Sequence, residues 1–209
     1  MRLTISIPCF GRPQRTRRMI NAVIAQNING WEALIIGDCC PVIQGIIDSG
    51  EYAIAQKVAA WGGNRLIIEN LDKNYGGCGY EITNRNIQRA SGDYFIFGAN
   101  DDLILPNHFE DYYYTIMPTL YDFMYFKTYV EPYKSIRDPR LERDQIGHSE
   151  LIVKTSYAKK MPPHSPEYGH DWTFIENLMA GGGTWTKAMY NDPTYIVKSV
   201  PVNQEQGID

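Results

Sequence analysis

The sequence lacks the marks of a membrane-spanning or secreted protein. No apolar run approaches the roughly 20 residues that a membrane-spanning helix needs. The start MRLTISIPCF passes directly into strand-like sequence and has no signal-peptide core. These absences predict a cytoplasmic protein without an integral membrane segment.

Cysteine is scarce, and there is no excess of basic charge. The four cysteines, Cys9, Cys39, Cys40 and Cys78, show no CxxC spacing, so neither a zinc site nor a disulfide framework is indicated. The formal net charge of -4 counts against a protein that coats nucleic acid, which needs a basic surface. No repeat, low-complexity tract or linker is visible, so the 209 residues predict a single domain.

Strand and helix patterns alternate through the first half of the chain. Apolar or alternating runs predict strands at Leu3–Pro8, Trp31–Gly37, Asn64–Glu69 and Tyr94–Gly98. Helical spacing predicts helices from Pro13 to about Asn27, from Pro41 to about Val58, and in the stretch that ends near Ser91. This order is typical of an α/β fold with a mainly parallel sheet, whose ligands bind at the carboxyl ends of the strands.

The second half is less regular. The patterns there predict a helix near Asn107–Met117, a strand near Phe123–Thr128, a charged surface loop at Glu131–Asp144, a strand at Ser149–Lys154, a helix at Asp171–Met179 and a closing β segment at Thr194–Val200. We therefore divide the chain into a nucleotide-binding half, residues 1–102, and an irregular half, residues 103–209.

Polar residues follow several of the predicted strands. Arg12 follows the first and Asp38 the second, a glycine-rich turn at Gly76 and Gly77 follows the third, and Asn100 follows the fourth. Parallel strands bring these positions to one edge of the sheet. Asp38 is suited either to accept a hydrogen bond from the imide of a uracil base or simply to form a turn.

Two adjacent acids and a basic cluster point to an anionic ligand. Asp101 and Asp102 offer hard oxygen ligands to Mg²⁺ or Mn²⁺ bridging two phosphates, although an acidic turn before a helix would look the same. Arg12 is the best placed arginine to meet such a phosphate. Asp171, at the start of a helix, is either a helix cap or a general base. A serine hydrolase is disfavoured because no G-x-S-x-G motif is present.

Taken in order, these motifs resemble family 2-like glycosyltransferases with the GT-A fold, from Leu3 to about Gly183. The stretch Ile5–Arg12 resembles the family's first-strand signature, which implies donor contacts from Pro8, Phe10 and Arg12. Asp38 resembles its base-binding acid. The loop and helix ahead of its metal motif match a set of residues that includes Gly76, Gly77 and Arg85.

The metal motif and the catalytic acid have counterparts as well. Asn100, Asp101 and Asp102 stand at the family's D-x-D position, with Ala99 in place of the first acid. The resemblance implies that Asn100 contacts the donor and that Asp101 and Asp102 bind the metal. It also implies that Asp171 is the catalytic base, with His170 replacing the acid that usually precedes it.

The resemblance implies a single Rossmann-like GT-A domain that transfers a sugar, with inversion, from a UDP-sugar to a glycan or other hydroxyl acceptor, aided by Mn²⁺ or Mg²⁺. Residues 103–209 then form the acceptor side, and a position beside a membrane-bound acceptor is compatible with the sequence. One alternative is a non-catalytic module that binds nucleotide sugars or glycans. The other is a sugar-1-phosphate nucleotidylyltransferase, but the Gly-rich, Arg-containing phosphate loop of that class is missing from Pro8–Pro13.

Overall fold

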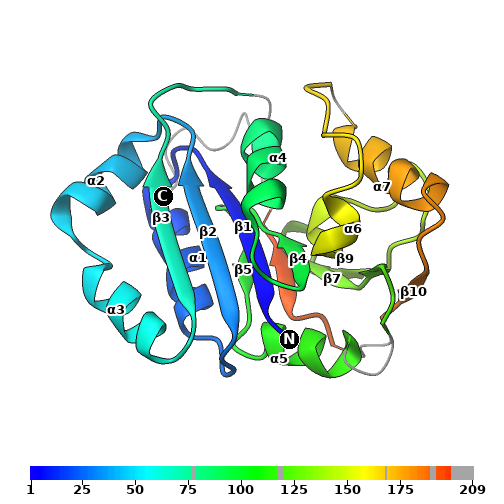
Figure 1. Cartoon of the computed structure of the whole chain (residues 1–209), viewed down its shortest axis with the longest axis horizontal. Helices are drawn as coiled ribbons and strands as arrows, with labels where there is room; N and C mark the ends of the chain where they lie inside the picture. Colours follow the sequence, from blue (N-terminus) through cyan, green and yellow to red (C-terminus); the bar gives the residue numbers. More distant parts are fainter. Residues whose placement is uncertain (77–78, 117–119, 168, 189–191, 199–209) are drawn as a thin grey trace.

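A seven-stranded sheet forms the centre of the molecule (Figure 1). The computed structural model describes residues 1–76, 79–116, 120–167, 169–188 and 192–198. The strands lie in the order β10 (Trp185–Lys187), β6 (Phe123–Tyr125), β9 (Leu151–Lys154), β4 (Tyr94–Phe97), β1 (Leu3–Cys9), β2 (Trp31–Gly37) and β3 (Arg65–Asn70). Only β9 runs antiparallel to its neighbours, β4 and β6, so the predicted mainly parallel sheet is confirmed.

Helices cover both faces of this sheet. One apolar cluster joins alternate residues of β1 and β2 to α1 (Pro13–Ile24), α2 (Pro41–Ser49), α3 (Ala53–Trp61) and α5 (His108–Ile116). A second cluster packs β4, β6 and β9 against α4 (Tyr80–Arg89), α6 (Thr155–Ala158) and α7 (His170–Ala180). Successive side chains of a strand point to opposite faces, so a strand buried on both sides is expected to be mostly apolar. Every residue of β2 is buried, and Glu32, its one charged residue, is paired with Arg65.

Two predicted elements differ from the structure. The single helix expected at 41–58 is two helices, because Gly50 adopts a left-handed conformation (φ 65°) and ends α2. The single strand expected at 123–128 is β6 followed by β7 (Thr128–Val130), and these two strands belong to different sheets.

A second, four-stranded sheet contains segments that were not predicted as separate strands from the sequence. Its order is β5 (Leu103–Ile104), β11 (Tyr195–Val197), β7 and β8 (Ser135–Arg137). β8 lies inside the stretch expected to be a surface loop. It begins just after the short 3-10 helix η2 (Glu131–Tyr133). A second 3-10 helix, η3 (His148–Glu150), leads into β9.

The carboxyl ends of the parallel strands meet at one edge of the main sheet. Cys9, the last residue of β1, pairs with Gly37, the last residue of β2, and Ser6 pairs with Phe97 at the end of β4. The loops that follow these strands therefore start side by side, as the sequence predicts. Among the described residues, no helix is both long and apolar enough to cross a membrane.

Candidate active site

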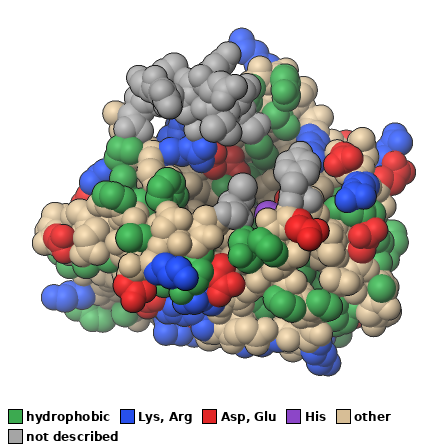
Figure 2. Space-filling model, turned by 90° about the horizontal axis from the view of Figure 1, so that it is seen from above, with side chains coloured by type: hydrophobic (Ala, Val, Ile, Leu, Met, Phe, Trp, Pro, Cys, Tyr) green, Lys and Arg blue, Asp and Glu red, His purple; other side chains and the backbone are tan. Residues whose placement is uncertain are grey.

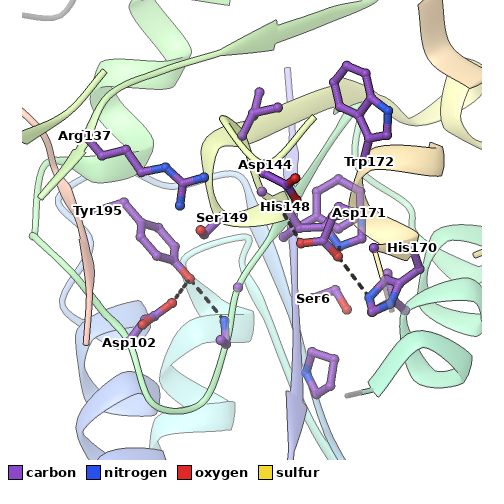
Figure 3. Close-up of a pocket in the computed structure, with 18 of the residues that line it drawn as sticks. Ser6, Asp102, Arg137, Asp144, His148, Ser149, His170, Asp171, Trp172 and Tyr195 are labelled. Carbon is purple, nitrogen blue, oxygen red and sulfur yellow. Dashed lines mark hydrogen bonds and ion pairs between the residues drawn. The ribbon is translucent and has the colours of Figure 1, made fainter. Parts of the chain in front are cut away.

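A cavity of about 730 Å³ opens next to this edge of the sheet. Figure 2 shows it as a hollow with a histidine at its floor and acidic side chains beside it. Its walls come from both halves of the chain, as the close-up in Figure 3 shows. The lining includes Ser6, Pro8, Asp102, Arg137, His148, Ser149, His170, Asp171, Trp172 and Tyr195.

The loop after β1 is tied to the end of β4. Arg12, in a left-handed conformation just before α1, forms an ion pair with Asp101 at 2.6 Å between Nη1 and Oδ2. The buried Asn100 donates from Nδ2 to Thr16 Oγ1 at 2.9 Å. These contacts bring together the strand-end residues that the sequence places at one edge. They also show that Arg12, Asn100 and Asp101 hold the loops in place.

Asp38 anchors the loop that precedes α4. Its buried carboxylate accepts hydrogen bonds from the backbone N–H groups of Tyr75 at 2.7 Å and Gly76 at 2.8 Å. A turn-forming role for Asp38 is therefore present in the structure, and the proposed base contact stays a prediction. Gly77 lies outside the described residues.

The other residues predicted to contact the donor lie in different surroundings; they are Pro8, Phe10 and Arg85. Arg85 lies on α4 and donates to the hydroxyl of Tyr75 at 2.7 Å, so it braces the loop that Asp38 anchors. Phe10 is 59% exposed. Pro8 lines the cavity and packs against Gly79, where a Cβ atom would lie 2.6 Å from the proline ring, so only glycine permits this approach of α4 to β1.

The buried carboxylate of Asp102 lines the cavity. It accepts hydrogen bonds from the Tyr195 hydroxyl at 2.9 Å and the Lys198 backbone N–H at 2.8 Å. Burial, together with the negative charge of Asp101, raises the pKa of Asp102 to about 7. Two neighbouring carboxylates that repel each other fit a divalent cation with oxygen ligands, because the cation would favour their ionised forms.

Asp171 faces the same cavity from the first turn of α7. Its Oδ1 lies 3.1 Å from His148 Nδ1 and 3.0 Å from His170 Nε2, and its Oδ2 lies 3.3 Å from the backbone N–H of His148. Burial favours a higher pKa for this carboxyl, but His148 and His170 outweigh burial and hold the pKa well below its usual range. These contacts, rather than bonds to the amides of its own helix, occupy the carboxylate, so capping does not account for Asp171.

Three histidines gather around this carboxylate, which the sequence patterns did not predict. His148 precedes β9, His164 lies in the loop before α7, and His170 begins α7. His148, His170 and Asp171 each bring one polar atom within 4.8 Å of the others. Both rings lie within ion-pair distance of Asp171 Oδ1. The available signal was that all three histidines lie within the 23 residues before the predicted base.

Solved structures share this fold across nearly the whole chain. TarS 1–349 of S. aureus matches 95% of this chain and 60% of its own with a TM-score of 0.74 at 15% identity. A structure of the same protein in complex with UDP-GlcNAc also has a TM-score of 0.74. The mannosyltransferase PcManGT from Pyrobaculum calidifontis, in complex with GDP-Man and Mn²⁺, covers 96% of this chain and 58% of its own with a TM-score of 0.68 at 12% identity. The GT-A fold predicted from the sequence is confirmed.

Sequence relatives are glycosyltransferases by name. The putative colanic acid biosynthesis glycosyl transferase WcaA of Escherichia coli K12 is 29% identical over 105 residues, which are 50% of this chain and 34% of WcaA. An uncharacterized glycosyltransferase of Rickettsia conorii is 30% identical over 108 residues, 52% of this chain and 16% of its own. The chain thus spans only part of the relatives it matches. The sequence model described as Glycosyl transferase family 2 matches residues 4–177, and the chain belongs to this family.

Proposed function

We propose that this protein transfers a sugar from a UDP-sugar to a hydroxyl group of an acceptor, with inversion at the anomeric carbon. The arrangement of carboxylates around the cavity carries the proposal. Figure 3 shows Asp102 with Tyr195 on one side and Asp171 with His170 on the other. An inverting displacement needs its base and its leaving group on opposite sides of the sugar, and this cavity offers both positions.

The carboxyl edge of the sheet is the proposed donor side. Asp38 and Arg12 follow β2 and β1, and solved structures of the same fold include complexes with UDP-GlcNAc and with GDP-Man and Mn²⁺. Asp101 and Asp102 would hold Mn²⁺ or Mg²⁺. When bound, such a cation neutralises the charge that develops on a departing diphosphate.

Asp171 is the proposed general base. Two ring nitrogens already contact Oδ1, while the described contact at Oδ2 is the longer one to a backbone amide. Oδ2 is therefore the oxygen best able to accept the acceptor's hydroxyl proton as that oxygen attacks the anomeric carbon. The lowered pKa keeps Asp171 ionised before the reaction, which a base requires.

Residues 103–209 form the proposed acceptor side. Arg137, His148 and Trp172 all come from this half and line the cavity opposite the strand ends. An indole ring and a guanidinium group suit a polyhydroxylated acceptor such as a glycan, through stacking and hydrogen bonding.

A UDP-release assay tests the function. The protein is incubated with Mn²⁺ and a panel of UDP-sugars, with and without simple glycosides as acceptors, and both UDP and the glycosylated product are measured. We expect UDP release that depends on one sugar donor and increases with a productive acceptor. Tight UDP binding by calorimetry without any UDP release would instead favour the non-catalytic binding module. Membership of family 2 already argues against a nucleotidylyltransferase.

A further inference from the structure

Two histidine rings approach the same oxygen of Asp171 from different segments of the chain (Figure 3). Asp171 Oδ1 lies 3.1 Å from Nδ1 of His148 on η3 and 3.0 Å from Nε2 of His170, which begins α7. The three side chains line the cavity, and each offers one polar atom within 4.8 Å of the others. Ligand atoms on one tetrahedral Zn²⁺, at bond lengths of about 2.0 to 2.2 Å, lie about 3 to 3.5 Å apart. The two distances to Asp171 therefore fit ligands of one metal ion.

The position of the proton on His148 is fixed by neighbours on the far side of its ring. His164 Nδ1 lies 2.8 Å from Asn84 Oδ1, which also accepts the backbone N–H of His164 at 2.7 Å. Asn84 Nδ2 donates to the His164 carbonyl at 3.0 Å, so the orientation of the amide is set and His164 Nδ1 carries the proton of that ring. His164 Nε2 is then an acceptor, and His148 Nε2 donates to it at 2.8 Å.

His148 therefore turns an unprotonated nitrogen toward Asp171. Burial lowers the pKa of His148 to about 4 and that of His164 to about 2, so each ring is neutral near pH 7 and carries one proton. Both protons are used in the contact between the rings and the contact with Asn84. The lone pair of His148 Nδ1 and the ionised carboxylate then face each other at 3.1 Å. A metal ion requires ligands in this state, a neutral imidazole and an ionised carboxylate.

The ring of His170 is oriented in the same way. Its Nδ1 lies 3.3 Å from the carbonyl oxygen of Glu167, which only accepts, so Nδ1 carries a proton and Nε2 faces Asp171. Asp171 raises the pKa of His170, and a metal ion at Nε2 takes the place of the proton that this ring otherwise holds there. Metal-binding histidines usually donate their other N–H to a neighbouring acceptor, which fixes the ring. Both rings have such an acceptor, the Glu167 carbonyl for His170 and His164 for His148.

This ligand set favours a different ion from the one expected at Asp101 and Asp102. Two imidazoles with one carboxylate suit Zn²⁺ and similar transition-metal ions, whereas carboxylates alone suit Mg²⁺ and Mn²⁺. The side chains of His148 and His170 are 15% exposed and that of Asp171 is 38% exposed, and all three line the cavity, so an ion can reach them. Three protein ligands leave at least one coordination position open to the cavity.

We propose that His148, His170 and Asp171 form a second metal site, that it binds Zn²⁺, and that its occupation inhibits sugar transfer. A cation on Asp171 withdraws charge from the carboxylate that accepts the acceptor's proton, so the zinc-loaded protein lacks its base. The inhibition rests on the proposed function of Asp171, whereas the binding of Zn²⁺ rests only on the contacts of the three side chains. The ion at Asp101 and Asp102 promotes transfer, and the ion at this second site opposes it.

Calorimetric titration with Zn²⁺ tests the site without any activity measurement. Excess Mg²⁺ is present to compete for the oxygen ligands after β4, and we expect the wild-type protein to bind one Zn²⁺. His170→Gln and Asp171→Asn should each raise the Kd for Zn²⁺ by at least about 10-fold. Cys39→Ser is the control, because an exposed thiol is a competing kind of zinc ligand, and it should keep the wild-type Kd. No saturable binding, or an unchanged Kd in both ligand variants, would overturn the proposal.

Nitrogen-15 NMR of the imidazole rings identifies the ligand atoms. In the metal-free protein at pH 7 we expect the proton of His148 on Nε2 and that of His164 on Nδ1. One equivalent of Zn²⁺ should shift the signals of His148 Nδ1 and His170 Nε2 and leave His164 Nδ1 protonated. A proton on His148 Nδ1 in the metal-free protein, or zinc-induced shifts confined to other histidines, would overturn the proposal.

The rate of transfer in saturating Mn²⁺ tests the inhibition. Zn²⁺ should lower wild-type turnover with an inhibition constant that matches the Kd from calorimetry. His170→Gln, compared with its own zinc-free rate, should require at least about 10-fold more Zn²⁺ for the same inhibition. Equal inhibition of both proteins would indicate displacement of Mn²⁺ at Asp101 and Asp102 and would overturn the inhibitory role, as would full turnover of the zinc-saturated wild-type protein. Loss of transfer in every protein, with Zn²⁺ binding intact, would count against the proposed function but not against the metal site.

Discussion

The two carboxylates on opposite sides of the cavity have opposite electrostatic surroundings. Asp102, after β4, is buried beside another acid, and its pKa is raised to about 7. Asp171, at the start of α7, has two histidines against one of its oxygens, and its pKa is held below the usual range. The same chemical group is thus prepared for two tasks. Asp102 gains from the arrival of a cation, whereas Asp171 already has two imidazoles against its carboxylate.

Removing the cation should have the largest effect, because Arg12 is the single positive partner described for the two carboxylates after β4 and its described ion pair is with Asp101. We expect EDTA to reduce UDP release to background and Mn²⁺ to restore it. Asp101→Asn should raise the Mn²⁺ concentration needed for half-maximal rate, since one oxygen ligand loses its charge. The measurement is initial rate against free Mn²⁺. Full turnover in chelator would mean that the acids after β4 are only a structural pair with Arg12.

Asp171→Asn tests the other side of the comparison. The amide keeps the size of the carboxyl group but cannot take a proton, so kcat should fall by roughly 10²-fold or more while UDP affinity barely changes. Asp144→Asn is the matched control. Asp144 also lines the cavity, and its left-handed backbone (φ 63°) tolerates asparagine. Near-normal turnover in a folded Asp171→Asn protein, or an equal loss in the control, would remove Asp171 from the mechanism.

Asp38→Ala examines the donor side away from the metal. If the carboxylate bonds the base of UDP, its loss should weaken UDP binding by about 1.5 to 3 kcal/mol, or about 10- to 150-fold in Kd. Calorimetry measures the change. Asn74→Ala removes the bond described between this side chain and the Asp38 carbonyl, and it is the control for loop order. Equal losses in the two variants would assign the effect to the loop instead of to a base contact.

The smallest expected effect is a shift in pH dependence. His170→Gln removes one of the two imidazoles that lower the pKa of Asp171, so this pKa should rise. A carboxylate whose pKa is lowered by folding stabilises the fold fully at pH values above its pKa in the unfolded chain. Both this stabilisation and the ability of Asp171 to act as a base are lost as the pH falls through the lowered pKa of the folded protein. The acid limb of the kcat profile should therefore move to higher pH in His170→Gln. An acid limb that does not move would mean that His170 leaves the base unaffected.

Most of the sheet was predictable because its strands carry strong local signals. Trp31–Gly37 is apolar except for Glu32, and the structure makes it β2 with the same bounds. Local sequence patterns did not predict the short strands, because these strands form only by pairing with distant segments of the chain. β5 has two residues and β10 has three, too few for any periodicity. Likewise, strand ends predicted the meeting of Arg12 with Asp101. His148 and His164 come from separate loops, however, and the sequence carries no pattern that places their rings in contact.

The position of β9 restricts where the chain can be cut and which parts of it can be exchanged with those of a relative. β9 belongs to the second half of the chain, yet it lies between β4 and β6 in the main sheet, with Val153 opposite both Phe95 and Phe123. A fragment cut after residue 102 would leave β4 as an open, apolar edge, which invites aggregation. Exchanging 103–209 for the corresponding part of a relative would also replace a strand of the donor-side sheet. Chimaeras meant to change acceptor choice should therefore keep β9 and exchange only the loops that reach the cavity.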